Sequence, residues 1–426
     1  MNIYNNPPRA EWPSLCRRAE QDNSLIQSRV EAIVERVRRE GDKALRALAE
    51  EIDGVSLQSL MVSEQEFCQA EQMVSAEVKA AIEVAARNIE TFHRAQLREG
   101  VDLQTQPGVR CVQRAVAIRR VGLYIPGGTA PLFSTVLMLA LPARIAGCRE
   151  VVLCTPTNRA GEVAAEVLYA ARRCGVEKVF TVGGAQAVAA MAYGPASVPT
   201  VDKIFGPGNR YVTLAKQMVA AHNTSIDMPA GPSEVMVMAD GSADAAFVAA
   251  DMLSQAEHGR DSQAIVVCSS EQIAVAVARE VERQQAQLAR ADYVAESLAN
   301  SRAVVFDSRE QMIAFAEEYA AEHLIISMRD AWKVAEEISS AGSIFIGNYS
   351  PESAGDYASG TNHTLPTSGW AHSCSGVNID SFMRKMTIQE LSEEGLKALA
   401  PTIEAMAEAE GLEAHAAAVR IRIEKC

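Results

Sequence analysis

The sequence lacks the features that mark several large classes of proteins. Its first residues contain no apolar run of the kind found in secretory signals, and its most apolar stretch, STVLMLALPA, is too short to cross a bilayer. The 40 basic residues are outnumbered by 54 acidic ones, no basic cluster occurs, and the formal charge is −14. Such a balance argues against nucleic acid as a partner. We therefore expect a cytoplasmic protein with no nucleic-acid or membrane partner.

Paired cysteines are also missing. The nine cysteines are an odd number, lie scattered along the chain and form no CxxC motif. This pattern indicates reduced thiols rather than a disulfide framework. Hydrophobic residues make up 48% and charged residues 22% of the 426 residues, which is typical of a soluble globular protein with two or three domains.

Short apolar runs alternate with helix-like segments through the middle of the chain. The runs are VGLYIP, VVLCTP, KVFTVGG, KIFGPG and EVMVMAD between residues 121 and 240, then AIVVCSS, AVVFDS, HLIISM and SIFIG between 264 and 347. Continuous Val/Ile/Leu strands separated by helices are typical of parallel βαβ units covered on both faces. The sequence therefore predicts an α/β protein with two doubly wound lobes.

The two ends of the chain have a different pattern. Much of the first 100 residues has helical spacing, and from about Asp380 strand patterns give way to helix formers. This tail has no sheet of its own. We expect it to pack on the body of the protein or on a second subunit.

Glycine-rich turns follow three of the predicted strands. They are YIPGGTAP, GGAQ and FGPGNRY, and each leads into a probable helix. Ligands of open parallel sheets bind outside the carboxyl ends of the strands, where such turns can hold a phosphate on backbone N–H groups. None matches GxGxxG, and a tight turn is the simpler explanation of any one of them. Three such turns in succession make a phosphate site as good an explanation as a tight turn.

Polar residues with chemical potential gather in four other segments. Gln255 and His258 are three apart near a helix end, a spacing that suits two ligands of one metal. With no cysteine nearby, such a metal would have nitrogen and oxygen ligands, as zinc or manganese accepts. Glu322 and His323 precede a strand, where an acid beside an imidazole suits acid–base chemistry. A lone Gln/His pair and a surface turn are the structural alternatives.

The other two segments lie later in the chain. The stretch AGDYASGTNHTLPT has neither helix nor strand pattern and contributes Asp356 and His363, and the tail contributes Glu410 and His415. Taken by itself, the stretch AGDYASGTNHTLPT could equally be a solvated surface loop. Together the four segments suggest a metal and acid–base site assembled from several elements.

Eight motifs, in this order, resemble the histidinol dehydrogenase family over nearly the whole chain. They are VGLYIPGG, GGAQAVAA, DKIFGPGN, DMPAGPSE, LSQAEHG, EHLII, SAGDYASGTNHTLPT and AEGLEAHAAAV. The resemblance implies oxidation of L-histidinol to L-histidine through the aldehyde, with NAD as oxidant and one Zn²⁺ per subunit. It also implies two Rossmann-like lobes in an intertwined homodimer whose active sites are shared.

The resemblance implies a role for each matching residue. The metal ligands would be Gln255, His258, Asp356 and His415, and the catalytic pair would be Glu322 and His323. The substrate would contact the metal ligands, His323, Ser233, His363 and Glu410, and NAD would lie near Tyr124, Gln186 and Asn209.

The resemblance also implies a division of the chain. We expect an arm over 1–17, a first lobe over 18–126 and 237–379 that carries most catalytic residues, a second, NAD-side lobe over 127–236, and a helical tail over 380–426 that reaches the partner subunit.

Four other functions compete with this interpretation. A sister dehydrogenase would act on another amino-alcohol or a sulfonated diol. An aldehyde dehydrogenase would use a cysteine nucleophile, for which Cys111 and Cys148 are candidates without a base beside them in sequence. A metal hydrolase would not need the glycine-rich turns, and a two-lobed binding protein would not need the Glu-His pair.

Overall fold

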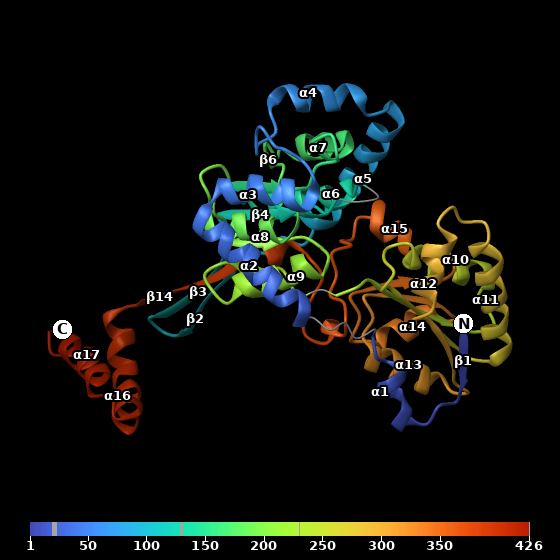
Figure 1. The fold of residues 1–426 in the computed structure, drawn as a ribbon. Coiled ribbons are helices and arrows are strands. Elements are labelled where there is room, and N and C mark those ends of the chain that lie inside the picture. Colours follow the sequence, from blue (N-terminus) through green and yellow to red (C-terminus); the bar gives the residue numbers. More distant parts are fainter. Residues whose placement is uncertain (19–23, 128–130, 230, 426) are drawn as a thin grey trace.

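The computed structural model describes residues 1–18, 24–127, 131–229 and 231–425, which form two α/β lobes and a projecting tail (Figure 1). Each lobe contains one parallel sheet with helices on both faces, and each of the nine predicted apolar runs contains a strand. None of the helices in these ranges has the length and apolarity that a membrane crossing requires.

One lobe contains the strands of the predicted NAD-side lobe and is called the first lobe from here on. It is built on a five-stranded parallel sheet with the order β6-β5-β4-β7-β8. Its strands are β4 (Arg120–Tyr124), β5 (Glu150–Cys154), β6 (Lys178–Phe180), β7 (Lys203–Phe205) and β8 (Ser225–Ile226). Side chains alternate between the two faces because the strand repeat is two residues. Val121 and Leu123 therefore join one core, whereas Tyr124 joins the other.

Two groups of helices cover this sheet: those that precede β4 and those between its strands. One face carries α2 (Ser24–Glu40), α3 (Asp42–Leu48), the π-helical turn Ala49–Asp53, α8 (Gly184–Tyr193) and α9 (Arg210–Ala220). The other carries α4 (Glu64–Met73), α5 (Ala76–Arg94), α6 (Phe133–Ala146) and α7 (Ala165–Arg173). Since α6 is buried almost all round, it reads as an apolar run without a polar face.

The second lobe is built on a six-stranded parallel sheet with the order β1-β11-β10-β9-β12-β13. Its strands are β1 (Asn2–Asn5), β9 (Glu234–Ala239), β10 (Gln263–Cys268), β11 (Arg302–Val305), β12 (His323–Ser327) and β13 (Ser343–Ile346). One face packs on α1 (Trp12–Leu15), α13 (Arg309–Tyr319) and α14 (Ala331–Glu336), and the other on α10 (Ala245–Ala256), α11 (Glu271–Gln285) and α12 (Ala291–Leu298).

The N-terminal arm is an integral part of the second lobe. Residues 2–5 form the edge strand β1, which pairs in parallel with β11. Trp12 is buried against Phe306 and Phe315. Arg18 then makes two hydrogen bonds to the buried Glu234 carboxylate, at 2.8 and 2.9 Å. The start of the chain is thus held on the sheet that carries the catalytic segments.

The sheet pairing divides the chain at other points than the predicted bounds. Strand β4 pairs with β5 and β7, and α2–α5 pack on the same sheet, so the segment before residue 127 lies with residues 127–226. Strand β9 begins at Glu234 and belongs to the other sheet. The predicted bounds, which the family resemblance implies, differ from this pairing of strands.

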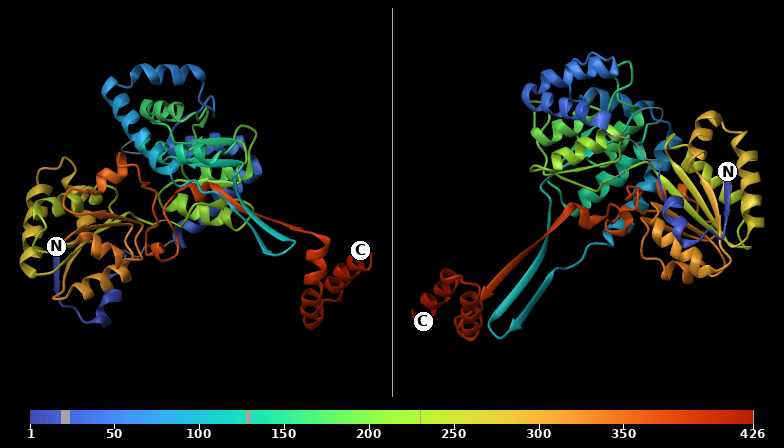
Figure 2. Two further views of the ribbon diagram at one scale, coloured as in Figure 1. Left: turned by 180° about the vertical axis from the view of Figure 1, so that it is seen from behind. Right: turned by 60° about the horizontal axis from the view of Figure 1, so that its bottom comes forward.

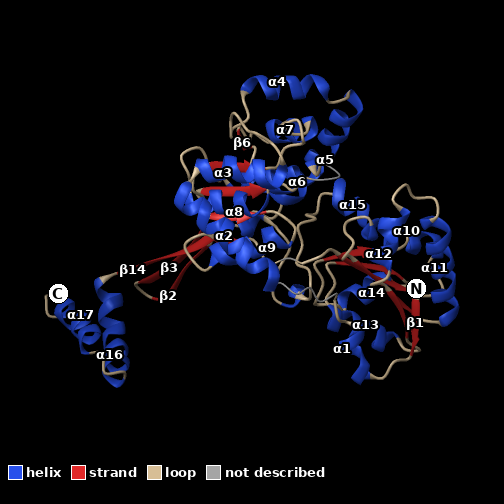
Figure 3. Cartoon of the chain, viewed as in Figure 1, coloured by secondary structure: helices blue, strands red, loops and turns tan. Residues whose placement is uncertain are grey.

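The tail begins with a strand, which corrects the prediction of a helical segment from Asp380. Strand β14 (Met383–Leu391) pairs antiparallel with β3 (Val109–Ala117), and β3 pairs with β2 (Val101–Gln106). The partner hairpin lies far earlier in the chain, so no local pattern announces the pairing. Figure 3 shows this three-stranded ribbon leading from the first lobe to the terminal helices.

The terminal helices α16 (Glu393–Ala409) and α17 (Glu413–Ile423) pack mainly on each other. Figure 2 shows them standing away from both lobes in two views. Met406 and Ile421 are 61% and 50% exposed here, and Val101 and Leu103 of the ribbon are 48% and 47% exposed. An arm with this much exposed apolar surface is typical of a segment that another chain covers.

Candidate active site

Residues from three segments meet at the edge of the second lobe where its strands begin. Glu322 and His323 stand at the start of β12, Gln255 lies in the last turn of α10, and Asp356 lies on α15 (Glu352–Tyr357). Helix α10 runs back along the sheet, so its C-terminal end returns to this amino edge. These side chains lie at the amino ends of the strands, whereas the glycine-rich turns follow the carboxyl ends of strands in the other lobe.

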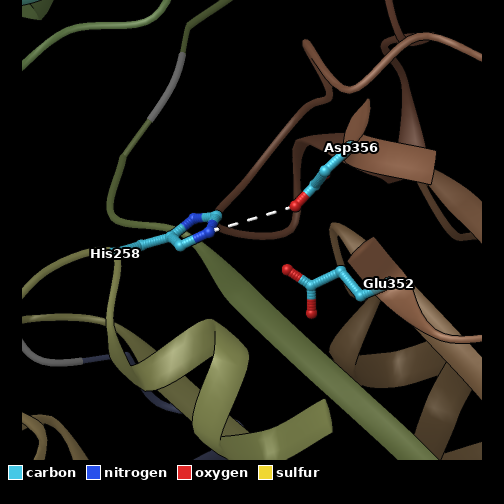
Figure 4. A group of neighbouring side chains, drawn as sticks. All are labelled: His258, Glu352 and Asp356. Carbon is cyan, nitrogen blue, oxygen red and sulfur yellow. Dashed lines mark ion pairs between the residues drawn. The ribbon is translucent and has the colours of Figure 1, made fainter. Parts of the chain in front are cut away.

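His258, Glu352 and Asp356 form a compact group of possible metal ligands. One ligand atom of each residue lies within 4.8 Å of the other two. His258 Nε2 is 3.9 Å from Asp356 Oδ2, and Figure 4 shows the imidazole and both carboxyl groups directed at the same space. These separations are too long for hydrogen bonds, and they suit atoms that share one ion.

Gln255 adds a further polar group to this part of the site. Its side chain is completely buried, yet neither its amide oxygen nor its amide nitrogen has a hydrogen-bond partner among the described residues. Both carboxylate oxygens of Glu352 and both ring nitrogens of His323 share this condition. Unpaired buried polar groups are costly and rare in native structures, so they indicate a site that a ligand completes.

The donor set fits a zinc ion. An imidazole nitrogen, a carboxylate oxygen and an amide oxygen come from His258, Asp356 and Gln255, and no thiolate is among them. Zinc accepts nitrogen and oxygen ligands and keeps an open position for substrate in catalytic sites. The unpartnered amide of Gln255 is the observation that favours a metal over a purely structural cluster.

His323 lies inside a shell of carboxyl groups. Its Nδ1 is 3.6 Å from Glu352 Oε1 and 3.9 Å from Glu322 Oε2, and its Nε2 is 3.7 Å from Asp356 Oδ1. The side chain is only 3% exposed. Burial, with smaller contributions from His258 and His363, lowers the pKa of His323 to about 3. The imidazole is therefore neutral at pH 7 and able to accept a proton.

Glu322 is held by the sheet itself. Its Oε2 accepts a hydrogen bond of 2.9 Å from the backbone N–H of Glu234, on the neighbouring strand β9. Burial raises the pKa of Glu322 well above its usual value, and the nearby Glu234 and Asp356 carboxylates add to the effect. One oxygen is thus fixed while the acid stays poised to exchange a proton.

Glu352 is a site residue that the sequence reasoning missed. Its side chain is 1% exposed, and burial, followed by the charges of Asp356, Glu322 and Asp251, raises its pKa well above its usual value. Glu352 and Asp356 are four residues apart on α15, which places them on one helix face. That spacing is the available signal, but the stretch AGDYASGTNHTLPT shows no helix pattern in the sequence, whereas α15 includes its first four residues.

His363 lies where the two lobes meet. Its Nδ1 is 2.8 Å from the backbone oxygen of Asp356, and its Nε2 is 3.1 Å from Thr135 Oγ1 on α6 of the first lobe. A carbonyl only accepts, so Nδ1 carries the proton. Burial lowers the pKa of His363 to about 4, so Nε2 of the neutral ring accepts from the Thr135 hydroxyl. Ser233 directly precedes Glu234, the first residue of β9.

The structure does not bring the two tail residues to the site of their own chain. His415 lies on α17 and Glu410 ends α16, both exposed on the projecting tail (Figure 1). Of the predicted residues, this chain brings His258, Asp356, Glu322 and His323 together at the metal group.

The predicted NAD residues lie at the carboxyl edge of the first lobe's sheet. Tyr124 ends β4, and its hydroxyl accepts a 3.0 Å hydrogen bond from the N–H of Gly184, at the start of α8. Gln186 is buried in the same turn of α8, and Asn209 caps α9 by accepting from two backbone N–H groups. This is the edge where open parallel sheets bind their ligands. Residues 128–130 of the YIPGGTAP turn lie outside the described residues.

The candidate cysteine nucleophiles lie elsewhere. Cys111 is on β3 of the ribbon, paired with Gln389. Cys148 follows α6 beside the Phe382 carbonyl, and burial raises the pKa of its thiol to about 12. A thiol in that state is a poor nucleophile at neutral pH.

Asp356 gives the metal-free site a pH signature. Burial raises its pKa from 3.8 to about 7. The folded chain thus keeps a proton that the unfolded chain has lost, and the stability from this proton is present below pH 4 and lost as the pH rises to 7. Compared with Asp356→Asn, the metal-free protein should lose about 1.4 kcal/mol of unfolding free energy per pH unit between pH 5 and 7.

Urea denaturation of both proteins after chelation measures this difference. Above pH 8 the difference should be constant, and added zinc should reverse the trend because it binds the ionised carboxylate. A difference that does not vary with pH would contradict the buried environment of Asp356.

Comparisons with known proteins identify the family of this chain. The family model for histidinol dehydrogenase matches residues 16–423. A histidinol dehydrogenase of Bacteroides fragilis (strain YCH46) is 54% identical over 100% of this chain and 99% of its own length. That of Escherichia coli (strain K12) is 52% identical over 96% of this chain and 94% of its own.

A solved structure is similar over the same range. The crystal structure of histidinol dehydrogenase from Elizabethkingia anophelis has a TM-score of 0.97 and 47% sequence identity, and it covers 100% of this chain and 98% of that one. The matches extend over both lobes and the tail. The chain belongs to the histidinol dehydrogenase family.

Proposed function

We propose that this protein oxidises L-histidinol to L-histidine through the aldehyde, in the cytoplasm, as the last step of histidine biosynthesis. The change from alcohol to acid releases four electrons, and NAD bound in succession at the first lobe is the hydride acceptor. The observation that carries the proposal is the buried set of unpartnered groups, Gln255, His323 and Glu352, beside His258 and Asp356. Membership of the family supports the same substrate.

Zinc would be held by Gln255, His258 and Asp356 of one chain and His415 of the partner subunit. When bound, it supplies a positive charge and a template that orients the imidazole and amine of histidinol. The rest of the chemistry falls to side chains of this protein.

In the first oxidation His323 is the base. Burial keeps the ring neutral, so the positive charge that it gains on taking the hydroxyl proton of the substrate has to be offset by the carboxyl groups around it. Nε2 faces the Asp356 side of the site, whereas Nδ1 faces Glu352 and Glu322. We assign the reacting position to Nε2, and the carboxyl group nearest Nδ1 steadies the positive charge that develops on the ring.

In the second oxidation Glu322 assists the water that attacks the aldehyde. The Glu234 N–H holds one of its carboxylate oxygens at 2.9 Å, so the other oxygen can take a proton from water. Because the group is buried, the aldehyde stays protected from solvent between the two steps. Glu322 and His323, which are adjacent at the start of β12, would thus divide the acid–base work.

The tail would complete the site of the other subunit of a homodimer. His415 and Glu410 cannot reach the metal group of their own chain in this arrangement, whereas the ribbon β14-β3-β2 gives the tail the length to reach a second chain. The exposed apolar residues of the tail would then become buried. In this arrangement Glu410 contacts the substrate, as do Ser233 and His363.

A sister dehydrogenase of the family is the alternative. Its substrate would be another amino-alcohol or a sulfonated diol, and the same base and metal ligands would serve. Glu410 and His363 favour histidinol, since the family uses these positions at the histidinol end of the site.

Product stoichiometry distinguishes the two substrates. The purified protein should form about two NADH for each L-histidinol, and a chelator should abolish turnover until zinc is restored. Absence of turnover with L-histidinol, together with turnover of another amino-alcohol or diol, would transfer the function to the sister group. NADH absorbance and zinc analysis of the same samples are the measurements.

The division of labour predicts different losses in the two half-reactions. His323→Gln should slow alcohol oxidation by about 100-fold or more, because it removes the base. Glu322→Gln should slow oxidation of supplied aldehyde by a similar factor and affect its reduction much less. His372→Gln and Glu317→Gln are matched controls of the same residue types, since the side chain of His372 contacts Ser340 and that of Glu317 bonds Ser339 and Ser340. Equal losses in both half-reactions for each variant would contradict the assignment.

Complementation tests the shared site. A His415→Ala chain mixed with a His258→Ala chain, after unfolding and refolding together, should regain about a quarter of wild-type activity, because half of the dimers then hold one intact site. Each variant refolded alone should remain inactive. Recovery no greater than that of the separate variants would mean that each tail serves its own chain.

A further inference from the structure

A buried ion pair lies under the glycine turn that follows β7. Lys216 of α9 and Asp227, just after β8, have side chains that are 5% and 1% exposed. We propose that this pair is a positioning device for the nucleotide, since it fixes the peptide of Gly206 and with it the turn 206–209. The inference rests on the proposed NAD site at Tyr124, Gln186 and Asn209. It adds buried residues that would hold the backbone of this site in position without contacting NAD.

The pair holds Gly206 through both of its backbone polar groups, which belong to the two successive peptide units on either side of its Cα. The N–H of Gly206 donates to Asp227 Oδ2 at 2.8 Å, and the carbonyl oxygen of Gly206 accepts from Lys216 Nζ at 2.9 Å. The second oxygen of Asp227 accepts from the N–H of Met228 at 2.8 Å and contacts Lys216 Nζ. Neither side chain can move without releasing a hydrogen bond to the turn.

Gly206 also lies hard against the residue that ends β4. Its φ is +127°, a conformation that side chains disfavour, and a Cβ there would lie 2.1 Å from the Tyr124 carbonyl oxygen. The turn therefore runs directly along the backbone of a proposed NAD contact. A shift of the Gly206 peptide would be transmitted to Tyr124 and, three residues on, to Asn209.

Asn209 connects the turn held by this ion pair to the start of α9. Its Oδ1 accepts from the N–H groups of Tyr211 and Val212 at 3.0 and 3.2 Å, which sets the start of α9. Lys216 lies further along the same helix, so α9 is tied to its own preceding turn at two points. The helix N-terminus and the turn form one rigid unit facing the nucleotide.

Stability alone does not require this pair. Replacing a buried ion pair by apolar residues of similar volume is often neutral or stabilising, whereas removing one partner leaves an uncompensated charge. What apolar side chains cannot supply is an acceptor for the N–H and a donor for the carbonyl oxygen of the same glycine. We therefore assign the pair to orientation of the turn.

The test uses the double variant Lys216→Met/Asp227→Leu of the full-length, zinc-loaded protein. The KM for NAD should rise about tenfold, while the KM for L-histidinol, the zinc content and the kcat at saturating NAD stay within about twofold. A general loss of structure would move all four quantities together. Should the double variant fail to fold, Asp227→Asn carries the same test, with an expected rise in the KM for NAD of about threefold.

Arg120→Met/Asp202→Leu is the matched control. This pair, 2.9 Å apart and 37% and 41% exposed, connects Arg120 at the start of β4 with Asp202 just before β7, at the sheet edge opposite the glycine turn, and its removal should leave the KM for NAD unchanged. Asn209→Ala separates the two levels of the argument. If Asn209→Ala raises the KM for NAD and the double variant does not, the positioning role is overturned and the NAD site stands. If neither variant changes it, both are overturned.

Discussion

One unfavourable arrangement dominates the second lobe, the burial of several polar side chains that have no hydrogen-bond partner among the described residues. Gln255, His323 and Glu352 end with unpartnered atoms at the amino edge of the six-stranded sheet. Each such group costs free energy, so the arrangement is retained for what it binds. A metal, the imidazole and amine of a substrate, and a histidine from elsewhere would together satisfy it. The elements around it are best understood as the means of holding these groups in place.

Two lobes of similar construction present opposite edges to the chemistry. The first lobe offers the carboxyl ends of its strands, with Tyr124 and the turns before α8 and α9, as open parallel sheets usually do. The second lobe offers the amino ends, because α10 and β12 deliver Gln255 and His323 there. His363 joins the two through Thr135. In the proposed function, the oxidant and the substrate would therefore approach each other from different lobes.

The sequence patterns identified most strands and few of their neighbours. All nine apolar runs contain strands because buried parallel strands are continuously apolar, a signal that is local. Strand β14 pairs with a hairpin far earlier in the chain, and β4 lies in the sheet of α2–α5; both are long-range facts that no window of sequence contains. Pattern alone also left Gln255, His258 and Asp356 as separate weak signals. Family resemblance grouped them, and Glu352 emerged only when α15 placed it beside His323.

The central claim is that one metal is bound jointly by the body of one subunit and the tail of another. Anomalous diffraction at the zinc edge, from crystals of the metal-loaded protein, tests this most directly. The account predicts one strong peak per chain, within bonding distance of Gln255, His258 and Asp356, with His415 of the partner subunit as the remaining protein ligand. A peak away from Asp356, or one completed by His415 of the same chain, would contradict it.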